Sequence, residues 1–307
     1  MNPYIEKLAA KRAEGKWLCV GIDPVPDKLP PGVGVVDFCK GIVQETIEVA
    51  TVYKPNIAFF EALGSEGMSI LRTVIVEIHL DDAMMPVIVD SKRADIGATN
   101  KAYVESLFNL LGADATTLNP YLGWGQGLDV FLGNQDWFGY VLCRTTNPGA
   151  VDVQDLLCEV KDFIPPGASK PKIGSRDLAP LYQVVAYKAT HEWNGNNNCG
   201  LVAGATYPEE LTKIRTIAPE LPLLIPGVGK QGGSLEQAVA AAYNPNIPAD
   251  FVINVSSFVS EAWKSEQFAA DPKDFASAAG KAAIFYHEQI KAAVEQLSSS
   301  GSQRRAI

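Results

Sequence analysis

Histidine is scarce in this chain of 307 residues, and its cysteines are few and scattered. The only histidines are His79, His191 and His287, and none follows a predicted strand, which disfavours histidine catalysis and a histidine-rich metal site. The five cysteines are odd in number and never spaced C-x-x-C. That pattern indicates reduced, mostly buried thiols in a cytoplasmic protein.

Basic patches and long apolar runs are also missing from the sequence. Net charge is −9, from 26 basic and 35 acidic residues, and the only basic cluster is Arg304-Arg305, so we expect no nucleic-acid binding. No apolar run reaches the length of a membrane span, and the segment that starts at Met1 is charged and amphipathic, unlike a signal peptide. We therefore expect a cytoplasmic protein with no membrane partner.

Hydrophobic residues are plentiful, at 47% of the chain, and they recur in strand-like runs separated by helical patterns. Most of these runs are about 30 residues apart, the size of one strand-plus-helix unit. Strands that alternate with helices form a parallel sheet, and eight such units predict an α/β fold, the (β/α)8 TIM barrel. An open doubly wound sheet is the alternative. The predicted strands are 18–22, 49–53, 87–89, 115–118, 140–143, 199–203, 223–225 and 251–255.

We expect a single domain over 1–297 with one irregular spacing inside it. An unusually long stretch separates the fifth and sixth strands, which predicts an insertion at about 150–198 with an extra helix near 177–191. Asn2-Pro3 is typical of a helix start, and a long helix is expected near 274–297. The serine-rich segment 298–307 is expected to be a disordered tail.

The most informative charges lie in Asp90-Ser-Lys92-Arg-Ala-Asp95, directly after the third predicted strand. Strand alternation points Asp90 and Lys92 to the same side. A charge pair that only faces solvent is the simpler interpretation, but Asp23 and Lys54 also follow strands. Because the carboxyl ends of barrel strands form one face, we predict that Asp23, Lys54, Asp90 and Lys92 converge there as a network of alternating charge.

A glycine-rich turn follows the seventh predicted strand. Its Gly227-x-Gly229-x-x-Gly232 pattern matches a dinucleotide-binding fingerprint, which belongs after the first strand of a sheet instead. After the seventh strand of a barrel, such a turn is typical of a phosphate site, since backbone N–H groups reach the anion unobstructed by side chains. A plain glycine-rich loop is the alternative.

These motifs together resemble the orotidine 5′-phosphate decarboxylase family, specifically its longer bacterial subfamily. The strongest match is the run Asp90-Ser-Lys92-Arg-Ala-Asp95-Ile96-Gly-Ala-Thr99, and the similarity extends over nearly the whole chain. The other matching runs are Leu18-Cys-Val-Gly-Ile-Asp23-Pro, Tyr53-Lys54-Pro-Asn-Ile-Ala-Phe-Phe-Glu, Thr145-Thr146-Asn-Pro-Gly and Pro226-Gly-Val-Gly-Lys-Gln231-Gly-Gly.

The resemblance implies a homodimeric barrel that converts orotidine 5′-phosphate (OMP) to UMP and CO2 in pyrimidine biosynthesis, with no metal and no organic cofactor. Asp23 and Lys54 would bind the ribose hydroxyls and complete the charged network. Asp90 would lie against the substrate carboxylate, and Lys92 would protonate C6 as CO2 leaves. A fixed ammonium beside C6 stabilises the charge that develops there and is also a proton source.

The resemblance also implies roles for residues farther from C6. Asp95, Ile96 and Thr99 would reach across the dimer interface into the partner's site, with Asp95 among the catalytic residues. Thr146 would read the pyrimidine edge. The phosphate would be held by the glycine-rich turn: Pro226, Gly227, Gly229, Gln231 and Gly232.

One position departs from the family pattern. After the eighth strand the family offers an arginine to the phosphate, and here Ser257 occupies that place. A hydroxyl and a backbone N–H still bind phosphate, but they lack the bidentate charge of a guanidinium. Lys230 and Arg144 are candidates to replace it.

Two other functions remain open from the sequence. One is a Mg2+-dependent sugar-phosphate lyase of the related barrel superfamily, which EDTA would inactivate. The other is a homologue that binds OMP or UMP without turnover, suggested by the missing arginine.

Overall fold

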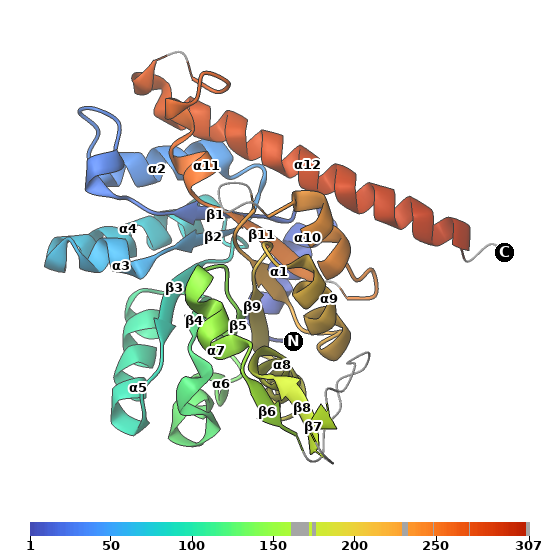
Figure 1. The fold of residues 1–307 in the computed structure, drawn as a ribbon. Coiled ribbons are helices and arrows are strands. Elements are labelled where there is room, and N and C mark those ends of the chain that lie inside the picture. The colour runs from blue at the N-terminus through green and yellow to red at the C-terminus, as the bar shows by residue number, and fades with distance from the viewer. Residues whose placement is uncertain (161–171, 174–175, 229–232, 248, 270, 305–307) are drawn as a thin grey trace.

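The computed structural model describes residues 1–160, 172–173, 176–228, 233–247, 249–269 and 271–304. Within them, eight parallel strands surround a common axis (Figure 1). Neighbouring strands pair in parallel around the sheet, and bridges Tyr53–Val87 and Asn56–Asp90 join its two ends into a closed barrel. The predicted (β/α)8 barrel is confirmed. The strands, in their order around the sheet, are β2 (Ala50–Pro55), β1 (Leu18–Ile22), β11 (Phe251–Val255), β10 (Leu223–Ile225), β9 (Cys199–Ala203), β5 (Phe138–Arg144), β4 (Ala115–Leu118) and β3 (Ile88–Arg93).

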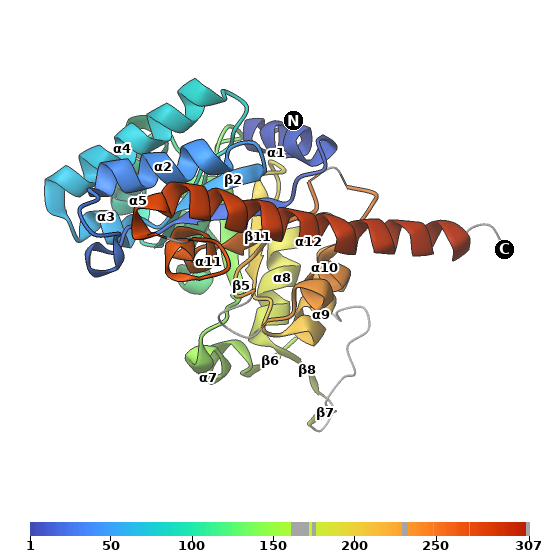
Figure 2. The same cartoon turned by 90° about the horizontal axis from the view of Figure 1, so that it is seen from above.

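Helices cover the outside of the barrel (Figures 1 and 2). The first is capped as predicted, because the Asn2 side chain accepts hydrogen bonds from the N–H groups of Tyr4 and Ile5. None of the helices in the described ranges is both long and apolar enough to span a bilayer. The α-helices are α1 (Pro3–Ala13), α2 (Val35–Thr46), α3 (Ile57–Glu61), α4 (Gly64–Asp81), α5 (Gly97–Val104), α6 (Asp129–Leu132), α7 (Val151–Gln154), α8 (Leu181–His191), α9 (Pro208–Ile217), α10 (Leu235–Ala242), α11 (Ser257–Ser260) and α12 (Phe275–Arg304).

The barrel interior is filled by a separate apolar cluster. Every strand contributes at least one buried side chain to it, from Cys19 on β1 to Val252 on β11. Tyr4 and Leu8 of α1 join this cluster, and the Tyr4 hydroxyl lies 2.9 Å from that of Tyr140. The Asn2 side chain donates to the carbonyls of Gln135 and Trp137, just before β5, so α1 closes the amino end of the barrel. The carboxyl ends are left for polar groups.

The insertion differs from the prediction. Helix α8 contacts β5 and β9, so it is the barrel's own helix between these strands and not an extra one. It begins at Leu181, because Pro180 disfavours helical geometry in the residue before it and the preceding segment pairs as a strand. The added elements are α7 and a small antiparallel sheet, whose order is β6 (Leu157–Glu159), β8 (Arg176–Pro180) and β7 (Lys172–Ile173).

The C-terminal helix is longer than predicted. Helix α12 continues to Arg304, where the sequence suggested a disordered tail from 298, and Figure 2 shows its last part projecting beyond α10. Ser298 and Ser299 lie within this helix, and each hydroxyl donates to the carbonyl four residues earlier. Tyr243 also hydrogen-bonds the Ser298 hydroxyl, at 2.7 Å. Residues 305–307 lie outside the described residues.

Candidate active site

A cavity of about 460 Å³ opens at the carboxyl ends of the barrel strands. Lys54 of β2 and Asp90 and Lys92 of β3 line its charged side. Leu142, Val202 and Leu224, from β5, β9 and β10, supply apolar surface. The cavity therefore sets ionised groups beside an apolar wall, as is typical of small-molecule sites. Its other lining residues are Thr117, Thr145, Thr146, Asn147, Gln154 and Pro226.

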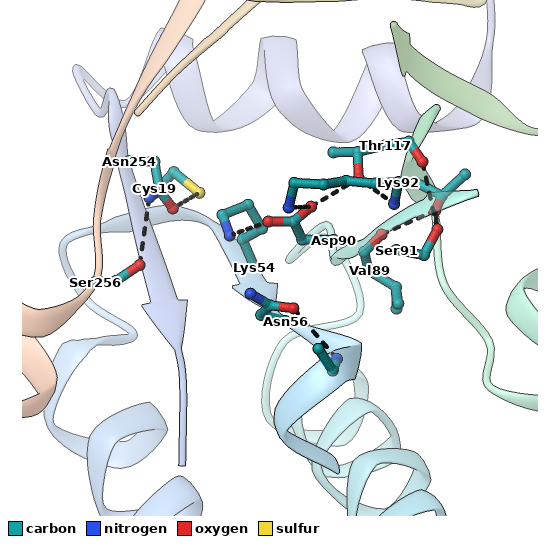
Figure 3. A network of polar contacts seen from close by, with 12 residues as sticks. Cys19, Lys54, Asn56, Val89, Asp90, Ser91, Lys92, Thr117, Asn254 and Ser256 are labelled. Atoms are coloured by element: carbon teal, nitrogen blue, oxygen red, sulfur yellow. Dashed lines mark hydrogen bonds and ion pairs between the residues drawn. The ribbon is translucent and has the colours of Figure 1, made fainter. Parts of the chain in front are cut away.

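Asp90 is the centre of the charged network. Its Oδ2 lies 3.0 Å from Nζ of Lys54, and its Oδ1 lies 2.7 Å from Nζ of Lys92 (Figure 3). The Thr117 hydroxyl donates a third hydrogen bond to Asp90, at 2.7 Å. The Lys54 side chain is nearly buried, whereas the Lys92 side chain is 51% exposed. Lys92 is thus the cation of this pair with room to approach a ligand.

The backbone at Lys92 is unusual. Its φ angle is +48°, in the left-handed region that non-glycine residues rarely adopt. The pairing of β3 with β4 shifts register between Val89 and Arg93, and the Lys92 N–H donates to the Thr117 hydroxyl at 2.9 Å. Asp90 and Lys92 therefore share a site as predicted, but through an irregular turn of the strand. Such strain costs on the order of 1 kcal/mol and is typical of functional positions.

The network shifts the pKa values of Asp90 and Lys54, which are both buried and contact each other. Burial alone would raise the pKa of Asp90, but the charges of Lys54 and Lys92 outweigh it and hold that pKa well below its usual range. Burial alone would lower the pKa of Lys54, but the carboxylates of Asp90 and Asp23 outweigh it, and the pKa is raised. Both groups are therefore charged at neutral pH.

Asp23 belongs to the network from a greater distance. Burial raises its pKa, and the charge of Lys54 and a hydrogen bond with Ser256 oppose that rise. Its Oδ1 is buried and accepts no hydrogen bond within the described part of the chain. Ser256 approaches because Gly21 lacks a side chain: a Cβ there would lie 2.0 Å from the serine oxygen. Asp23 is absent from the residues that line the cavity, but its charge acts on Lys54 and raises the pKa of that lysine.

The residues expected to serve a partner subunit lie at the start of α5, outside the cavity lining. Asp95 accepts a hydrogen bond from the Ile96 N–H at 2.7 Å, and Asn100 donates to the Asp95 carbonyl. Ile96 is 54% exposed and Thr99 is also exposed. An exposed isoleucine beside an ordered carboxylate agrees with a contact surface, and the role of these residues stays a prediction.

The predicted phosphate residues are only partly described. Pro226 lines the cavity, and Gly227 has a φ of +96° that favours glycine. Gly229, Lys230, Gln231 and Gly232 lie outside the described residues. Ser257 is the first residue of α11 and lines a neighbouring cavity of about 300 Å³.

Arg144, the other candidate phosphate cation, is buried and ion-paired with Asp155 at 3.3 Å. It is absent from the lining of the main cavity. Arg144 is therefore held by Asp155 outside the main cavity and is not placed to replace the missing phosphate arginine there.

Two polar residues that line the cavity, Thr117 and Gln154, were not singled out from the sequence. Thr117 ends a predicted strand, and that position was its only signal. Gln154 lies in the insertion, at the end of α7. It reaches the cavity by folding back onto Thr145 in the loop after β5, and no local sequence pattern indicates that contact. Within the described residues, no three His, Cys, Asp or Glu side chains gather as a metal site would require.

A parallel barrel with a charged cavity at the carboxyl ends of its strands defines a (β/α)8-barrel enzyme. The family described as orotidine 5′-phosphate decarboxylase / HUMPS matches residues 16–163. The orotidine 5′-phosphate decarboxylase of Herpetosiphon aurantiacus is 41% identical over 280 residues, which cover 90% of this chain and 92% of that protein. That of Roseiflexus sp. (strain RS-1) is 40% identical, with 85% and 90% covered.

A solved structure agrees with these relatives. The OMP decarboxylase of Leishmania donovani superposes with a TM-score of 0.74 at 36% identity, covering 94% of this chain and 98% of that one. The chain belongs to the orotidine 5′-phosphate decarboxylase family, and it is an enzyme of the carboxy-lyase class. The resemblance noted in the sequence is confirmed.

Proposed function

We propose that this chain decarboxylates OMP to UMP and CO2, a step of pyrimidine biosynthesis, without a metal or an organic cofactor. The observation that carries the proposal is the array in which Asp90 bonds Lys54 at 3.0 Å and Lys92 at 2.7 Å within the cavity. Relatives at about 40% identity are named for the same reaction. The cavity volume also lies in the range of small-ligand sites.

The proposed chemistry takes place at C6 of the pyrimidine. The bond from C6 to the carboxylate breaks, CO2 leaves, and the electron pair stays on C6. The Lys92 ammonium then donates its proton to C6, forming the new C–H bond and leaving a neutral amine. Since no cofactor accepts the electron pair, the fixed charge of Lys92 must stabilise it.

Asp90 would act on the substrate carboxylate in the ground state. It is ionised and held in place by Lys54 and Thr117, so a carboxylate bound beside it would be repelled. Departure of CO2 relieves that repulsion. Lys54 and Asp23 would bind the ribose hydroxyls while keeping the network charged.

The remaining contacts would orient the nucleotide. Thr146 would read the pyrimidine edge from the cavity wall. The phosphate would bind Ser257 and the turn after β10, whose members are Pro226, Gly227, Gly229, Gln231 and Gly232. Phosphate contacts far from C6 supply binding energy that aligns the reacting end.

The proposal is tested by adding the purified protein to OMP and following the ultraviolet absorbance as OMP becomes UMP. We expect conversion, and we expect the same rate after dialysis against EDTA, because no step uses a metal. A folded protein that leaves OMP unchanged would sink the proposal. Conversion that EDTA abolishes would instead favour the magnesium-dependent chemistry of the related superfamily.

The shared site predicts subunit complementation. Lys92→Ala and Asp95→Ala variants should each be inactive, because one lacks its own lysine and the other deprives its partner of a carboxylate. Refolding an equal mixture should restore about a quarter of the wild-type sites, since half the dimers are mixed and each has one intact site. The measurement is activity per active-site equivalent. A mixture as inactive as its components would show that Asp95 serves its own barrel or none.

Ser257→Arg should lower the KM for OMP by about tenfold, because a guanidinium adds a charged, bidentate phosphate contact. Steady-state kinetics provide the measurement. Ser265→Arg is the matched control, because Ser265 lines the same cavity as Ser257 and is not among the predicted phosphate residues. An equal KM for Ser257→Arg and wild type would mean that another group already compensates.

A further inference from the structure

The insertion contributes one side chain to the main cavity. Gln154 is the last residue of α7, and it lines the cavity together with Thr145 and Thr146. The other elements of the insertion, the sheet of β6, β7 and β8, follow it directly. Gln154 therefore connects the insertion to the residues that line the cavity.

Gln154 binds the loop after β5 through both ends of its amide. Its Oε1 accepts from the Thr145 N–H at 2.9 Å and from the Arg144 guanidinium at 3.4 Å. Its Nε2 donates to the Thr145 hydroxyl at 2.8 Å. That hydroxyl in turn donates to Oδ1 of Asn147 at 2.7 Å.

The direction of these hydrogen bonds is fixed by chemistry. A backbone N–H and a guanidinium only donate, so the end of Gln154 that faces them must be its oxygen. The amide nitrogen then faces Thr145, whose hydroxyl is left with one proton for Asn147. Reversing the Gln154 amide would set its nitrogen against the Thr145 N–H and the Arg144 guanidinium, so the orientation of this side chain is fixed.

The same loop is held from two further sides. Arg144 is 2% exposed, ion-paired with Asp155 of the insertion at 3.3 Å and stacked 4.0 Å from the centre of the Tyr207 ring. Thr146 packs against Gly204, where a Cβ would lie 2.5 Å from its methyl group. The insertion and the loop after β9 therefore clamp the segment expected to read the base.

We propose that Gln154 is a positioning residue that holds Thr145 and Thr146 in the arrangement that binds the pyrimidine base. This inference rests on the proposed function, because it assigns the base to the side of the cavity that Thr146 lines. It gives the insertion a role in substrate affinity. Gln154 acts through Thr145 and donates no proton to the reacting atoms.

The test compares Gln154→Met with Gln154→Glu. Methionine keeps the length of the side chain and removes all three hydrogen bonds, so the KM for OMP should rise about tenfold or more with a smaller change in kcat. Glutamate keeps the acceptor for the Thr145 N–H and for Arg144, so it should recover part of the affinity. Asp152→Ala, an exposed position on the same helix, is the control and should match wild type.

A double-mutant cycle separates positioning from general destabilisation. If Gln154 acts through Thr145, then Thr145→Val combined with Gln154→Met should raise KM less than the product of the single effects. A KM for Gln154→Met within twofold of wild type, or fully multiplicative effects, would overturn the inference.

Binding of UMP, measured by titration calorimetry, distinguishes failure of this inference from failure of the proposed function. Wild type that binds UMP without converting OMP would refute the proposed activity, and weakened UMP binding by Gln154→Met would still support the positioning role. Wild type that neither converts OMP nor binds UMP would refute both.

Discussion

Replacing Lys92 with alanine is expected to lower kcat for OMP by about a thousandfold or more while the barrel stays folded. Lys92 is the exposed cation of the network, so its ammonium is the group able to reach C6. Its loss removes both the proton source and the charge opposite the electron pair. Kinetics should therefore show a large fall in kcat, with circular dichroism and melting temperature close to wild type.

The backbone makes retention of the fold a reasonable expectation. The left-handed geometry of Lys92 is fixed by its N–H bond to Thr117 and by the irregular pairing of β3 with β4, neither of which uses the side chain. Asp90 also keeps Lys54 as its counterion.

Lys213→Ala, an exposed position on α9, is the matched control and should keep full activity. An unfolded Lys92→Ala protein would mean that this lysine is structural. Activity within tenfold of wild type would remove Lys92 from the mechanism.

The barrel could be predicted from the sequence because its strands are short apolar runs between turn-forming segments. The predicted bounds of β1 and β4 match the structure for that reason. The helix predicted at 177–191 is present but begins only at Leu181, because the residues before it pair as β8 with the distant β6, and only Pro180 indicated that this segment is extended. The helix beyond residue 297 was missed because serines at 298 and 299 suggest a tail, whereas here they bond back to the helix.

The charged residues of the candidate site could be predicted from the sequence, whereas the backbone conformation and the contacts that position them could not. Strand alternation correctly brought Asp90 and Lys92 together, but it gave no sign of the left-handed turn that aims Lys92. Thr117 and Gln154 were missed because each acts through partners on another element, which a single sequence does not reveal.

Replacing Lys54 with methionine is expected to lower the free energy of unfolding by about 3 kcal/mol or more at pH 7. The ammonium of Lys54 is the buried counterion of Asp90 and also acts on Asp23. Its pKa is raised by folding, so its contribution is complete below the unfolded-state pKa and is lost only as pH rises through the folded-state value. At pH 7 that contribution is therefore fully present in wild type and fully lost in the variant.

The difference in the free energy of unfolding between wild type and Lys54→Met should become smaller as the pH falls. Without Lys54, burial raises the pKa of Asp23 further above that of an unfolded aspartate, about 3.9, because its main opposing charge is lost, whereas Lys92 and Thr117 still contact Asp90. A carboxylate whose pKa is raised by folding costs stability above its unfolded pKa, so the deficit is largest at neutral pH and shrinks as Asp23 protonates. Urea unfolding at pH 7 and pH 5 measures the difference.

Two further variants identify the Asp23 carboxylate as the cause. Asp23→Asn in the Lys54→Met background removes the buried charge that has lost its main counterion and should recover part of the lost stability. Lys213→Met, on the exposed face of α9, should stay within about 0.5 kcal/mol of wild type at both pH values. A Lys54→Met deficit that is equal at pH 7 and pH 5 would mean that lost packing, and not buried carboxylate charge, destabilises the barrel.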